Sequence, residues 1–330
     1  MIDTPEGINW PSIDQALSQA KNIHLITHRL PDSDGIGSQI ALYHGLRQRG
    51  QAVFMHNYDP VPRICRYLDG AELITHGKRD PAMHPDVVVS LDAGSFSRLH
   101  MPDSLRQSAT LINIDHHASN THFGAINAID DRYCATGAMI FDLLAVMHTP
   151  LSPAIAQALY AAILTDTGSF RNNSVNADVY RMVATLMDAG ADAALAAEHA
   201  YASHKFERFN LLKEALDTLC LSNNQRTAWM YLDASMFART GCVVEDSEGF
   251  IDYARSIGIV DVTVMMCQLE QETWKITFRG KRGINVGALA TTLGGGGHRY
   301  AAGCTLEGSN ADVRARVQKA VTETLQGAIL

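Results

Sequence analysis

Three apolar segments in the first half of the sequence end in the same chemistry, an aspartate or a histidine. They are 22–28 (NIHLITH), which ends on His28, 85–94 (PDVVVSLDAG), with Asp92, and 109–117 (ATLINIDHH), with Asp115, His116 and His117. A segment with helical apolar spacing, 37–50, follows the first of them, and strands that alternate with helices form parallel sheets. Ligands of such sheets collect at the carboxyl ends of the strands. The pattern therefore predicts an α/β fold with polar chemistry at one edge of a sheet.

The order of the expected elements divides the chain into two α/β domains. A length of 330 residues suits two domains of common size. After the first strands come mostly helical segments, and from about residue 213 strands and helices alternate again. We predict strands at 22–28, 51–57, 85–94, 109–117, 226–233, 260–270 and 273–280, and helices at 37–50, 136–148, 152–168, 176–190, 283–294 and 311–325. The predicted divisions are an N-terminal parallel-sheet domain (1–190), a helical linker (191–212) and a smaller α/β C-terminal domain (213–330).

The charge of the chain narrows the classes of ligand. It carries 27 basic and 35 acidic residues, a net charge of −8, and no basic run. Proteins that hold long nucleic acids usually have a basic stripe, because neutralising phosphates supplies much of the affinity. We therefore expect no long nucleic acid as a partner, and any ligand that carries phosphates should be short.

No segment predicts a membrane or secreted protein. The longest apolar stretches fall far short of the roughly 20 residues that span a bilayer. The N-terminus, MIDTPEGINW, has no basic region followed by an apolar core. The six cysteines contain no CxxC pair, which is typical of reduced thiols in the cytosol. We therefore expect a cytoplasmic protein that contacts no membrane.

Aspartates and histidines gather at the expected strand ends and at one helix end. Asp32 and Asp34 follow His28 in the stretch HRLPDSDGIGS, and Asp166 follows an apolar helical segment. Taken singly, each has a structural explanation, such as a turn residue at Asp32 or a helix cap at Asp92. Together, several carboxylates and imidazoles at one edge repel each other unless cations neutralise them. Mixed Asp and His ligation suits Mn²⁺ or Mg²⁺, less often Co²⁺ or Zn²⁺, and the ligands suffice for two ions that share a carboxylate.

Five ordered motifs resemble a known family. HRLPDSDGIGS, SLDAGSFSRL, NIDHHASN and ILTDTGSFR are similar, in order and spacing, to the four motifs of the DHH phosphoesterase superfamily. FRGKRGINVGALATTLGGGGHRYAAGC resembles the signature of the DHH-associated C-terminal domain. The match covers nearly the whole chain, and its length and GGGGH element are most similar to bacterial nanoRNA-degrading oligoribonucleases that can also act on pAp. Ser33 and Ile36 stand where relatives vary, and no ligand is lost.

The resemblance implies a set of metal ligands and a pair of residues that act on the phosphate. The implied ligands are His28 and Asp32 for one ion, Asp34, His116 and Asp166 for the other, and Asp92 as a bridge between both. His117 would touch the scissile phosphate, and Asp115 would orient a neighbouring imidazole. The implied cofactor is a pair of divalent ions, Mn²⁺ ahead of Mg²⁺ or Co²⁺.

In the family, the C-terminal domain holds the part of the substrate remote from the cut. Arg279 stands at a predicted strand end, where its guanidinium could bind a phosphate through two hydrogen bonds or be a surface charge. The run Gly294–Gly297 could offer unhindered N–H groups to a phosphate or base, or form a flexible loop. The candidate substrate-binding residues are Arg279, Gly295, Gly296, Gly297, His298 and Arg171, and beyond them Arg299.

These observations predict a metal-dependent phosphodiesterase with its active site in the cleft between the domains. The expected substrates are linear dinucleotides, such as pGpG or pApA, and very short RNA, which would be cut to mononucleotides. A 3′-phosphatase of pAp would use the same residues on a shorter ligand, whereas intact cyclic dinucleotides and pyrophosphate rank lower. A non-catalytic nucleotide-binding regulatory module is the alternative from another class, but its centre should lack ligands, and all six implied metal ligands are present. A homodimer is the one protein partnership that we expect.

Overall fold

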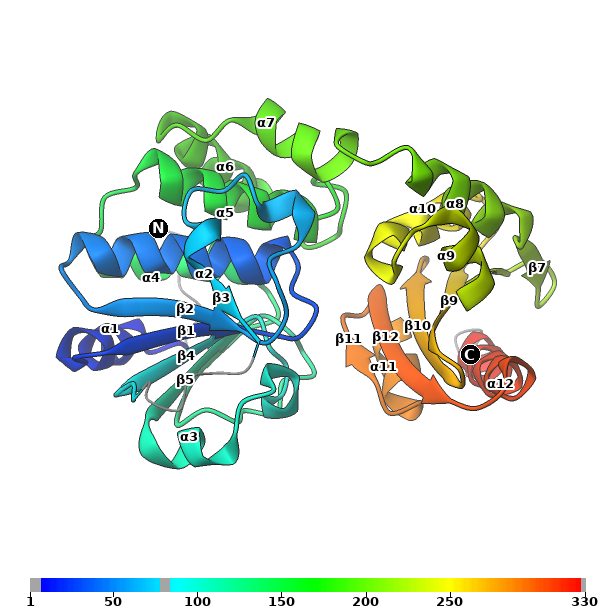
Figure 1. The fold of residues 1–330 in the computed structure, drawn as a ribbon, viewed down its shortest axis with the longest axis horizontal. Helices are drawn as coiled ribbons and strands as arrows, with labels where there is room; N and C mark the ends of the chain where they lie inside the picture. Colours follow the sequence, from blue (N-terminus) through cyan, green and yellow to red (C-terminus); the bar gives the residue numbers. More distant parts are fainter. Residues whose placement is uncertain (1–6, 78–83, 328–330) are drawn as a thin grey trace. The chain divides into compact units, whose positions relative to one another are not determined.

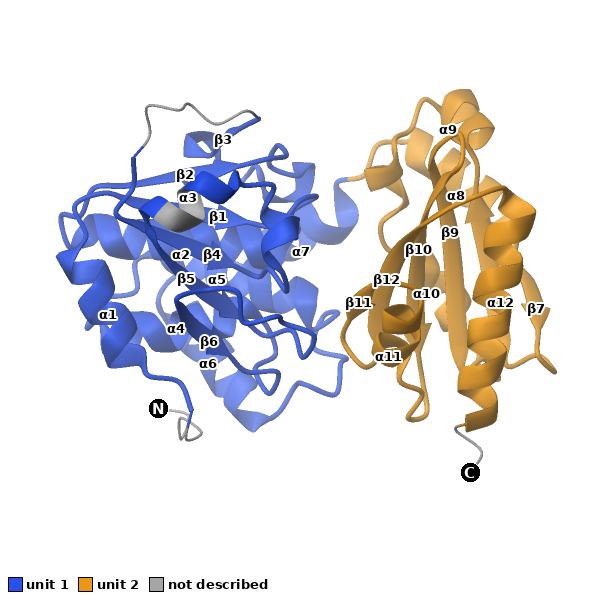
Figure 2. Ribbon diagram, turned by 90° about the horizontal axis from the view of Figure 1, so that it is seen from below, with its two compact units in different colours: residues 1–203 blue, residues 204–330 orange. Residues whose placement is uncertain are grey.

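The structure of the chain, a computed structural model, describes residues 7–77 and 84–327 (Figure 1). The chain forms two compact units, residues 1–203 and 204–330, which are blue and orange in Figure 2. The division between them falls within 191–212, the segment for which we predict a linker. Each unit contains one six-stranded sheet, and each is described by itself.

The first unit is built on a parallel sheet with the strand order β3-β2-β1-β4-β5-β6. Its strands are β1 (Ile23–Thr27), β2 (Val53–Asn57), β3 (Thr75–His76), β4 (Val87–Leu91), β5 (Thr110–Asp115) and β6 (Ile126–Ile129). Strands β1 and β4 lie at the centre of the sheet and are buried along their whole length. Burial on both faces explains why IHLIT and VVVSL are nearly continuous apolar runs.

Alternate residues of these strands pack into two cores. Leu25 and Val89 belong to the large core that the sheet shares with helices. Ile26 and Val88 belong to a smaller core with Leu99, because successive side chains of a strand point to opposite faces. The sheet is therefore packed on both faces.

Helices follow three of the strands described in the first unit, β1, β4 and β6 (Figure 1). The helices of this unit are α1 (Trp10–Gln19), α2 (Ser33–Gln48), α3 (Asp103–Ser108), α4 (Thr136–Val146), α5 (Pro153–Asp166), α6 (Ala177–Asp188) and α7 (Ala193–Ala197), with a π-helical turn at Glu198–Ala202 and 3₁₀ turns at Arg63–Cys65, Ala71–Leu73 and Phe96–Leu99. Helix α2 begins earlier than the predicted residue 37, because the Asp32 side chain accepts hydrogen bonds from the amides of Asp34 and Gly35 and caps it.

The second unit has a mixed sheet with the order β11-β12-β10-β9-β8-β7. Strands β8 and β9 pair in parallel, and the other described pairs are antiparallel. The strands are β7 (Cys220–Ser222), β8 (Thr227–Leu232), β9 (Val262–Glu270), β10 (Thr273–Gly280), β11 (Gly296–Gly297) and β12 (Ala301–Glu307). The helices are α8 (Glu207–Asp217), α9 (Ala234–Thr240), α10 (Phe250–Arg255), α11 (Val286–Thr292) and α12 (Asn310–Gly327), with a 3₁₀ turn at Val244–Ser247.

Two cores also stabilise the second unit. Helix α12 buries Val313, Val317 and Val321, which recur at i, i+4 spacing, in a core that contains Phe278 of β10. A second core joins helices α8 and α10 to β8 and β9 and includes the fully buried Phe250. Among the helices of the described residues, none is long and apolar enough to cross a membrane.

Candidate metal centre

The carboxyl ends of three adjacent strands bring the first candidate residues together. His28 follows β1, Asp92 follows β4, and His116 follows β5, and these strands are neighbours in the sheet. In the ladder, Thr27 lies beside Leu91, and Leu91 lies beside Ile114, so the strands end at nearly the same level. The three polar side chains are at most 4% exposed.

Two helices bring further carboxylates to this edge. Asp34 lies in the first turn of α2 and is 1% exposed, and Asp166 is the last residue of α5. Helices α2 and α5 lie very close together, because Gly37 has no side chain: a Cβ there would lie 2.4 Å from the carbonyl oxygen of Ala158. The close approach places the ends of both helices beside the strand ends.

The contacts around Asp92 divide the ligands into two groups. Its Oδ2 lies 3.4 Å from Nε2 of His28, which is also 3.8 Å from Oδ2 of Asp32. Its Oδ1 lies 3.7 Å from Nε2 of His116. The two oxygens of one carboxylate therefore face two different imidazoles, as a carboxylate shared between two ions must do.

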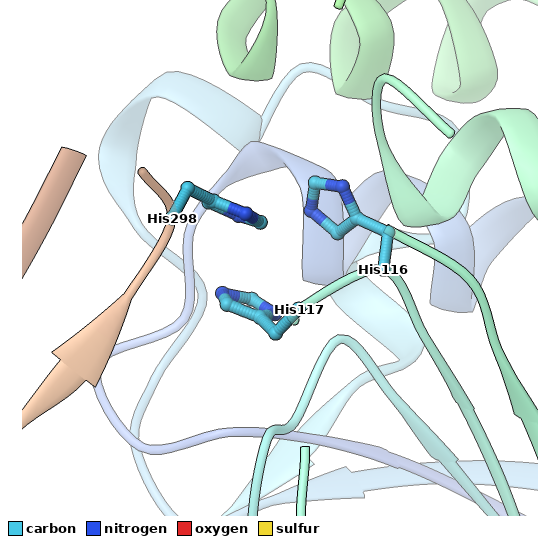
Figure 3. Close-up of side chains that lie close together, drawn as sticks. All are labelled: His116, His117 and His298. Atoms are coloured by element: carbon cyan, nitrogen blue, oxygen red, sulfur yellow. The ribbon is translucent and has the colours of Figure 1, made fainter. Parts of the chain in front are cut away.

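His116 is the centre of the second group. Its Nε2 lies 3.5 Å from Oδ2 of Asp34 and 3.4 Å from Oδ2 of Asp166. Figure 3 shows His116 beside His117 at the end of β5, with the ring centroids 5.1 Å apart. The structure thus brings together the six residues for which metal binding is expected.

Backbone carbonyls set the orientation of two imidazoles. Nδ1 of His28 lies 2.7 Å from the carbonyl oxygen of Arg29, and Nδ1 of His116 lies 3.2 Å from that of Tyr133. An N–H at Nδ1 that donates to a carbonyl leaves Nε2 to face the carboxylates, and this tautomer is the one that ligates a metal through Nε2. The donor set therefore fits a divalent cation.

Electrostatics also favour a cation at this edge. Burial raises the pKa of the Asp34 carboxyl well above its ordinary value, and the charges of Asp92 and Asp166 raise it further. Burial also raises the pKa of Asp166, to about 6. The charge of His116 lowers this pKa, and the charge of Asp92 raises it. A divalent ion among these carboxylates would relieve both effects.

Asp34 has a structural role as well. Its Oδ2 accepts a hydrogen bond from the Thr136 amide at 2.7 Å, and its Oδ1 accepts one from the Gly137 amide at 2.8 Å. These amides open helix α4, whose N-cap Ala135 provides no side-chain acceptor. Oδ1 also accepts from the Ser38 hydroxyl at 3.4 Å, whereas Oδ2 retains a further lone pair, so the cap and a metal bond through Oδ2 are compatible.

His117 is held by Asp115 through a short hydrogen bond. Its Nδ1 donates to Oδ1 of Asp115 at 2.6 Å, and the Asn120 side-chain amide donates to the other oxygen at 2.6 Å. Burial opposes the charge of His117, but this bond to Asp115 prevails and raises the pKa of the imidazole to about 9. Burial would raise the pKa of Asp115, but the bond to His117 outweighs this effect and lowers the pKa to about 2. The pair therefore presents a fixed imidazole beside the cluster.

Strained backbone surrounds the centre. Asp92 has φ of 58°, and Gly168–Phe170, directly after α5, have φ of 57°, 62° and 61°. Residues other than glycine adopt this left-handed conformation at a cost of about 1–2 kcal/mol each. The Thr167 hydroxyl accepts from the Phe170 amide and the Asn172 side-chain amide donates to the Asp166 carbonyl, each at 3.0 Å, so the turn is held in place. Strain of this kind is concentrated at functional sites.

Arg98 and Thr136 lie beside the cluster although we do not predict them. The Thr136 hydroxyl donates to Oδ1 of Asp92 at 3.2 Å, and the Arg98 guanidinium lies 3.0 Å from Nδ1 of His28. Arg98 stands within the motif SLDAGSFSRL, which could have pointed to it. Thr136 has no comparable signal, because its contact joins positions 44 residues apart.

The arginine candidates have different surroundings. Arg279 alternates with buried Phe278 on β10, so its half-buried side chain lies on the opposite face of that sheet. Its guanidinium donates to the Phe278 carbonyl at 3.2 Å, and no carboxylate among the described residues pairs with it. Arg171 is exposed, and its Nε donates to the Gly168 carbonyl at 2.6 Å. Arg299 is exposed, and it donates to the carbonyl of Gly283 at 3.1 Å.

Strand packing accounts for much of the glycine run. Gly296–Gly297 form strand β11 and pair with Gly303 and Ala302 of β12, so the alternative of a flexible loop is wrong for these two residues. A Cβ at Gly295 would lie 2.1 Å from the carbonyl oxygen of Gly303. Half-buried His298 follows directly. A role of these residues toward substrate stays a prediction.

The comparisons identify the family. The model of the "DHH family, N-terminal domain" matches residues 22–163, and that of the "DHHA1 domain" matches residues 234–327. The chain is 31% identical over 307 residues to the bifunctional oligoribonuclease and PAP phosphatase NrnA of Thermus thermophilus, and the match covers 92% of this chain and 90% of that protein. This chain belongs to the DHH family.

Solved structures share the DHH fold. An exopolyphosphatase-related protein from Bacteroides fragilis superposes with a TM-score of 0.85 at 25% identity, covering 96% of this chain and 95% of that one. RecJ of Thermus thermophilus in complex with Mn²⁺ has a TM-score of 0.56 at 14% identity, covering 97% of this chain and 54% of that one. The cluster described above is thus a His and Asp site on a DHH scaffold, with a donor set that could bind metal.

Proposed function

We propose that this protein, a hydrolase of phosphoester bonds, cleaves linear dinucleotides and very short RNA to mononucleotides with two divalent cations. Mn²⁺ fits the mixed Asp and His donors best. The observation that carries the proposal is Asp92, whose two buried oxygens face His28 on one side and His116 on the other. Its support from the comparisons is the 31% identity to a protein named as an oligoribonuclease and PAP phosphatase.

The residues divide the work as follows. One ion would be held by His28 and Asp32. The other ion would be held by Asp34, His116 and Asp166. Asp92 would bind both ions. When bound, the ions supply Lewis acids that polarise the phosphate and neutralise the charge that develops on its oxygens. Asp115 holds Nδ1 of His117, and we assign Nε2 of that imidazole to the scissile phosphate. Four of these ligands, His28, Asp34, Asp92 and His116, are buried, which keeps them fixed, so little reorganisation is needed during the reaction.

A short substrate also agrees with the charge of the chain. With a net charge of −8, it has little to offer a long phosphate backbone. In the second unit, Arg279 has no carboxylate partner among the described residues, and its charge is thus available to a phosphate. We infer that this unit holds the end of the substrate remote from the cut and so limits its length.

The proposal is tested by product analysis with a panel of substrates. Protein stripped with a chelator is incubated with pGpG, pApA, a longer RNA or pyrophosphate, with and without added Mn²⁺ or Mg²⁺, and the products are separated by chromatography. We expect mononucleotides from the dinucleotides only after metal is restored, with Mn²⁺ more effective than Mg²⁺. Full turnover in excess chelator would contradict the metal mechanism, and faster cleavage of the longer RNA would contradict the substrate class.

A 3′-phosphatase activity on pAp is the second candidate. The relative at 31% identity is named for both activities, and a 3′-phosphate would meet the same cluster as an internucleotide phosphate. Release of phosphate from pAp, measured beside dinucleotide cleavage in the same preparations, decides whether the chain has one activity or both.

A further inference from the structure

Three loops of the first unit bring two aromatic rings and a guanidinium together beside the metal centre. Arg29 follows β1, Tyr58 follows β2, and His100 follows the 3₁₀ turn after β4. The ring centroids of Tyr58 and His100 are 4.5 Å apart, and the guanidinium carbon of Arg29 lies 5.1 Å from the centroid of the Tyr58 ring. The Arg29 guanidinium also lies 3.2 Å from Nε2 of His100. We call these three residues the stacking platform.

The platform is directly connected to a candidate metal ligand. Arg29 is the next residue after His28, and its carbonyl accepts the hydrogen bond from Nδ1 of His28. Its amide donates to the carbonyl of Arg98 at 2.8 Å, and the Arg98 guanidinium lies 3.0 Å from the same imidazole. The loops that form the platform are therefore the loops that orient His28.

Backbone strain and a carboxylate fix these loops. Leu30 and His100 both have φ of 50°, a conformation that is unfavourable for a side chain as large as leucine. Asp59 holds the first loop, since its Oδ2 accepts from the Leu30 amide at 2.8 Å and lies 3.6 Å from Nε of Arg29. Strained conformations persist only where their surroundings determine them, and here they keep the platform in one arrangement.

The platform is open to solvent. Tyr58 is 41% exposed, Leu30, which follows Arg29 in the chain, is 47% exposed, and both Arg29 and His100 are exposed. A single exposed aromatic residue needs no explanation. Two aromatic rings and an arginine, held rigidly at the side of a phosphate-cleaving centre, are the combination on which nucleobases stack in single-stranded nucleic-acid sites.

We propose that Arg29, Tyr58 and His100 stack against one nucleobase of the substrate, on a nucleotide adjoining the scissile phosphate. The proposal rests on the proposed cleavage of short RNA. Stacking uses the π-face that every base has, so this contact tolerates any sequence. It therefore gives affinity for nucleotides over phosphoesters without bases, while leaving base preference to other contacts.

The test combines enzyme variants with substrates that lack one base. Wild-type enzyme, Tyr58→Ala and Tyr58→Phe are assayed in Mn²⁺ with pApA and with two analogues in which one or the other adenine is removed. Stacking is worth about 5- to 100-fold in kcat/KM, carried mainly by KM because it acts on substrate and transition state alike. For Tyr58→Ala, we expect this loss of kcat/KM with pApA and with the analogue that keeps the stacked adenine. With the analogue that lacks the stacked adenine, we expect no loss. Tyr58→Phe should have kcat/KM values near those of the wild type.

Matched variants separate stacking from a general defect. Tyr253→Ala removes an exposed tyrosine of the second unit (49% exposed), and kcat/KM should stay unchanged for all three substrates. His100→Asn removes the other ring and keeps a residue that tolerates positive φ, so it should give the same substrate pattern if Tyr58→Ala folds poorly. Equal losses of kcat/KM on all three substrates, or no loss on any of them, would overturn the proposal that the platform stacks on a nucleobase. Wild-type enzyme that leaves pApA uncut would instead overturn the proposed function, and the platform with it.

Discussion

Two aspartates of the metal centre and one aspartate of the second unit have pKa values shifted in opposite directions. In the first unit, Asp34 and Asp166 have raised pKa values, because burial and neighbouring carboxylates both disfavour their charge. In the second unit, Asp261 is buried at 5% exposure, yet its pKa is lowered. There burial is outweighed by Arg226 and Arg282, which donate to its two oxygens at 2.6 and 2.5 Å.

The difference indicates which carboxylates serve the fold and which serve the chemistry. Asp261 is neutralised within its own unit, so it needs nothing from outside the chain. The aspartates at the sheet edge repel each other in the protein alone, and such an arrangement costs stability unless a cation joins it. Natural proteins retain destabilising clusters where activity requires them. Substitutions in the two sets should therefore separate activity from stability.

The largest expected effect comes from Asp92→Asn. The substitution keeps a residue that tolerates φ of 58° but removes the charge that faces both His28 and His116. We expect kcat to fall about a thousandfold or more. The metal-free protein should keep its thermal stability, because repulsion with Asp34 and Asp166 is relieved. Activity near the wild-type rate would place the centre elsewhere, and Asp261→Asn, assayed in parallel, should retain full activity.

His117→Ala should give the next largest loss. Because Nδ1 of His117 is occupied by Asp115, we assign its other nitrogen to the phosphate and not to an ion. Removal of a group that contacts the reacting phosphate lowers kcat by about 100- to 1,000-fold. Metal content, measured on the purified variant by elemental analysis, should equal that of the wild type. Loss of a full equivalent of metal would make His117 a ligand instead.

Arg279→Ala tests whether the second unit holds the substrate. A charge-assisted contact to a remote phosphate predicts a fall of about 10- to 100-fold in kcat/KM for a 5′-phosphorylated dinucleotide. Bis-p-nitrophenyl phosphate has no remote phosphate, so its hydrolysis should change little. Lys275→Ala, on the same face of β10, is the matched control for loss of a positive charge. Equal losses on both substrates would show that Arg279 supports the fold or the chemistry.

The edge of the first sheet could be predicted because strand ends are local. IHLIT, VVVSL and TLINI are recognisable as buried strands, and the polar residue that ends each is read directly from the sequence. The strand order, in which β4 lies between β1 and β5, comes from the structure and places His28, Asp92 and His116 side by side.

Contacts between distant segments could not be predicted in this way. The cap that Asp34 provides for α4 joins residues 102 and 103 positions apart. The left-handed turn Gly168–Phe170 is imposed by its surroundings, since neither serine nor phenylalanine favours positive φ. The glycines near β11 pack closely against the backbone of β12, which leaves no space for a side chain. The sequence pattern does not specify the position of β12.

Asp261→Asn has the smallest expected effect on activity. It tests whether the carboxylate that is paired within the second unit serves the fold alone. Its ion pairs with Arg226 and Arg282 are confined to the second unit, so kcat should not change. The free energy of unfolding should fall by about 1–2 kcal/mol at neutral pH, a modest value because Arg282 is largely solvated. Chemical denaturation of both proteins measures this difference.

The pH dependence of that difference identifies its cause. The folded protein lowers the pKa of Asp261 below its ordinary value of 3.8, so the stabilisation is fully present above that pH and is lost as pH falls through the lower, folded pKa. Wild type and Asp261→Asn should therefore differ most at neutral pH and converge in acid. A difference that persists unchanged in acid would mean that Asp261 acts through its shape and hydrogen bonds, and not through its charge.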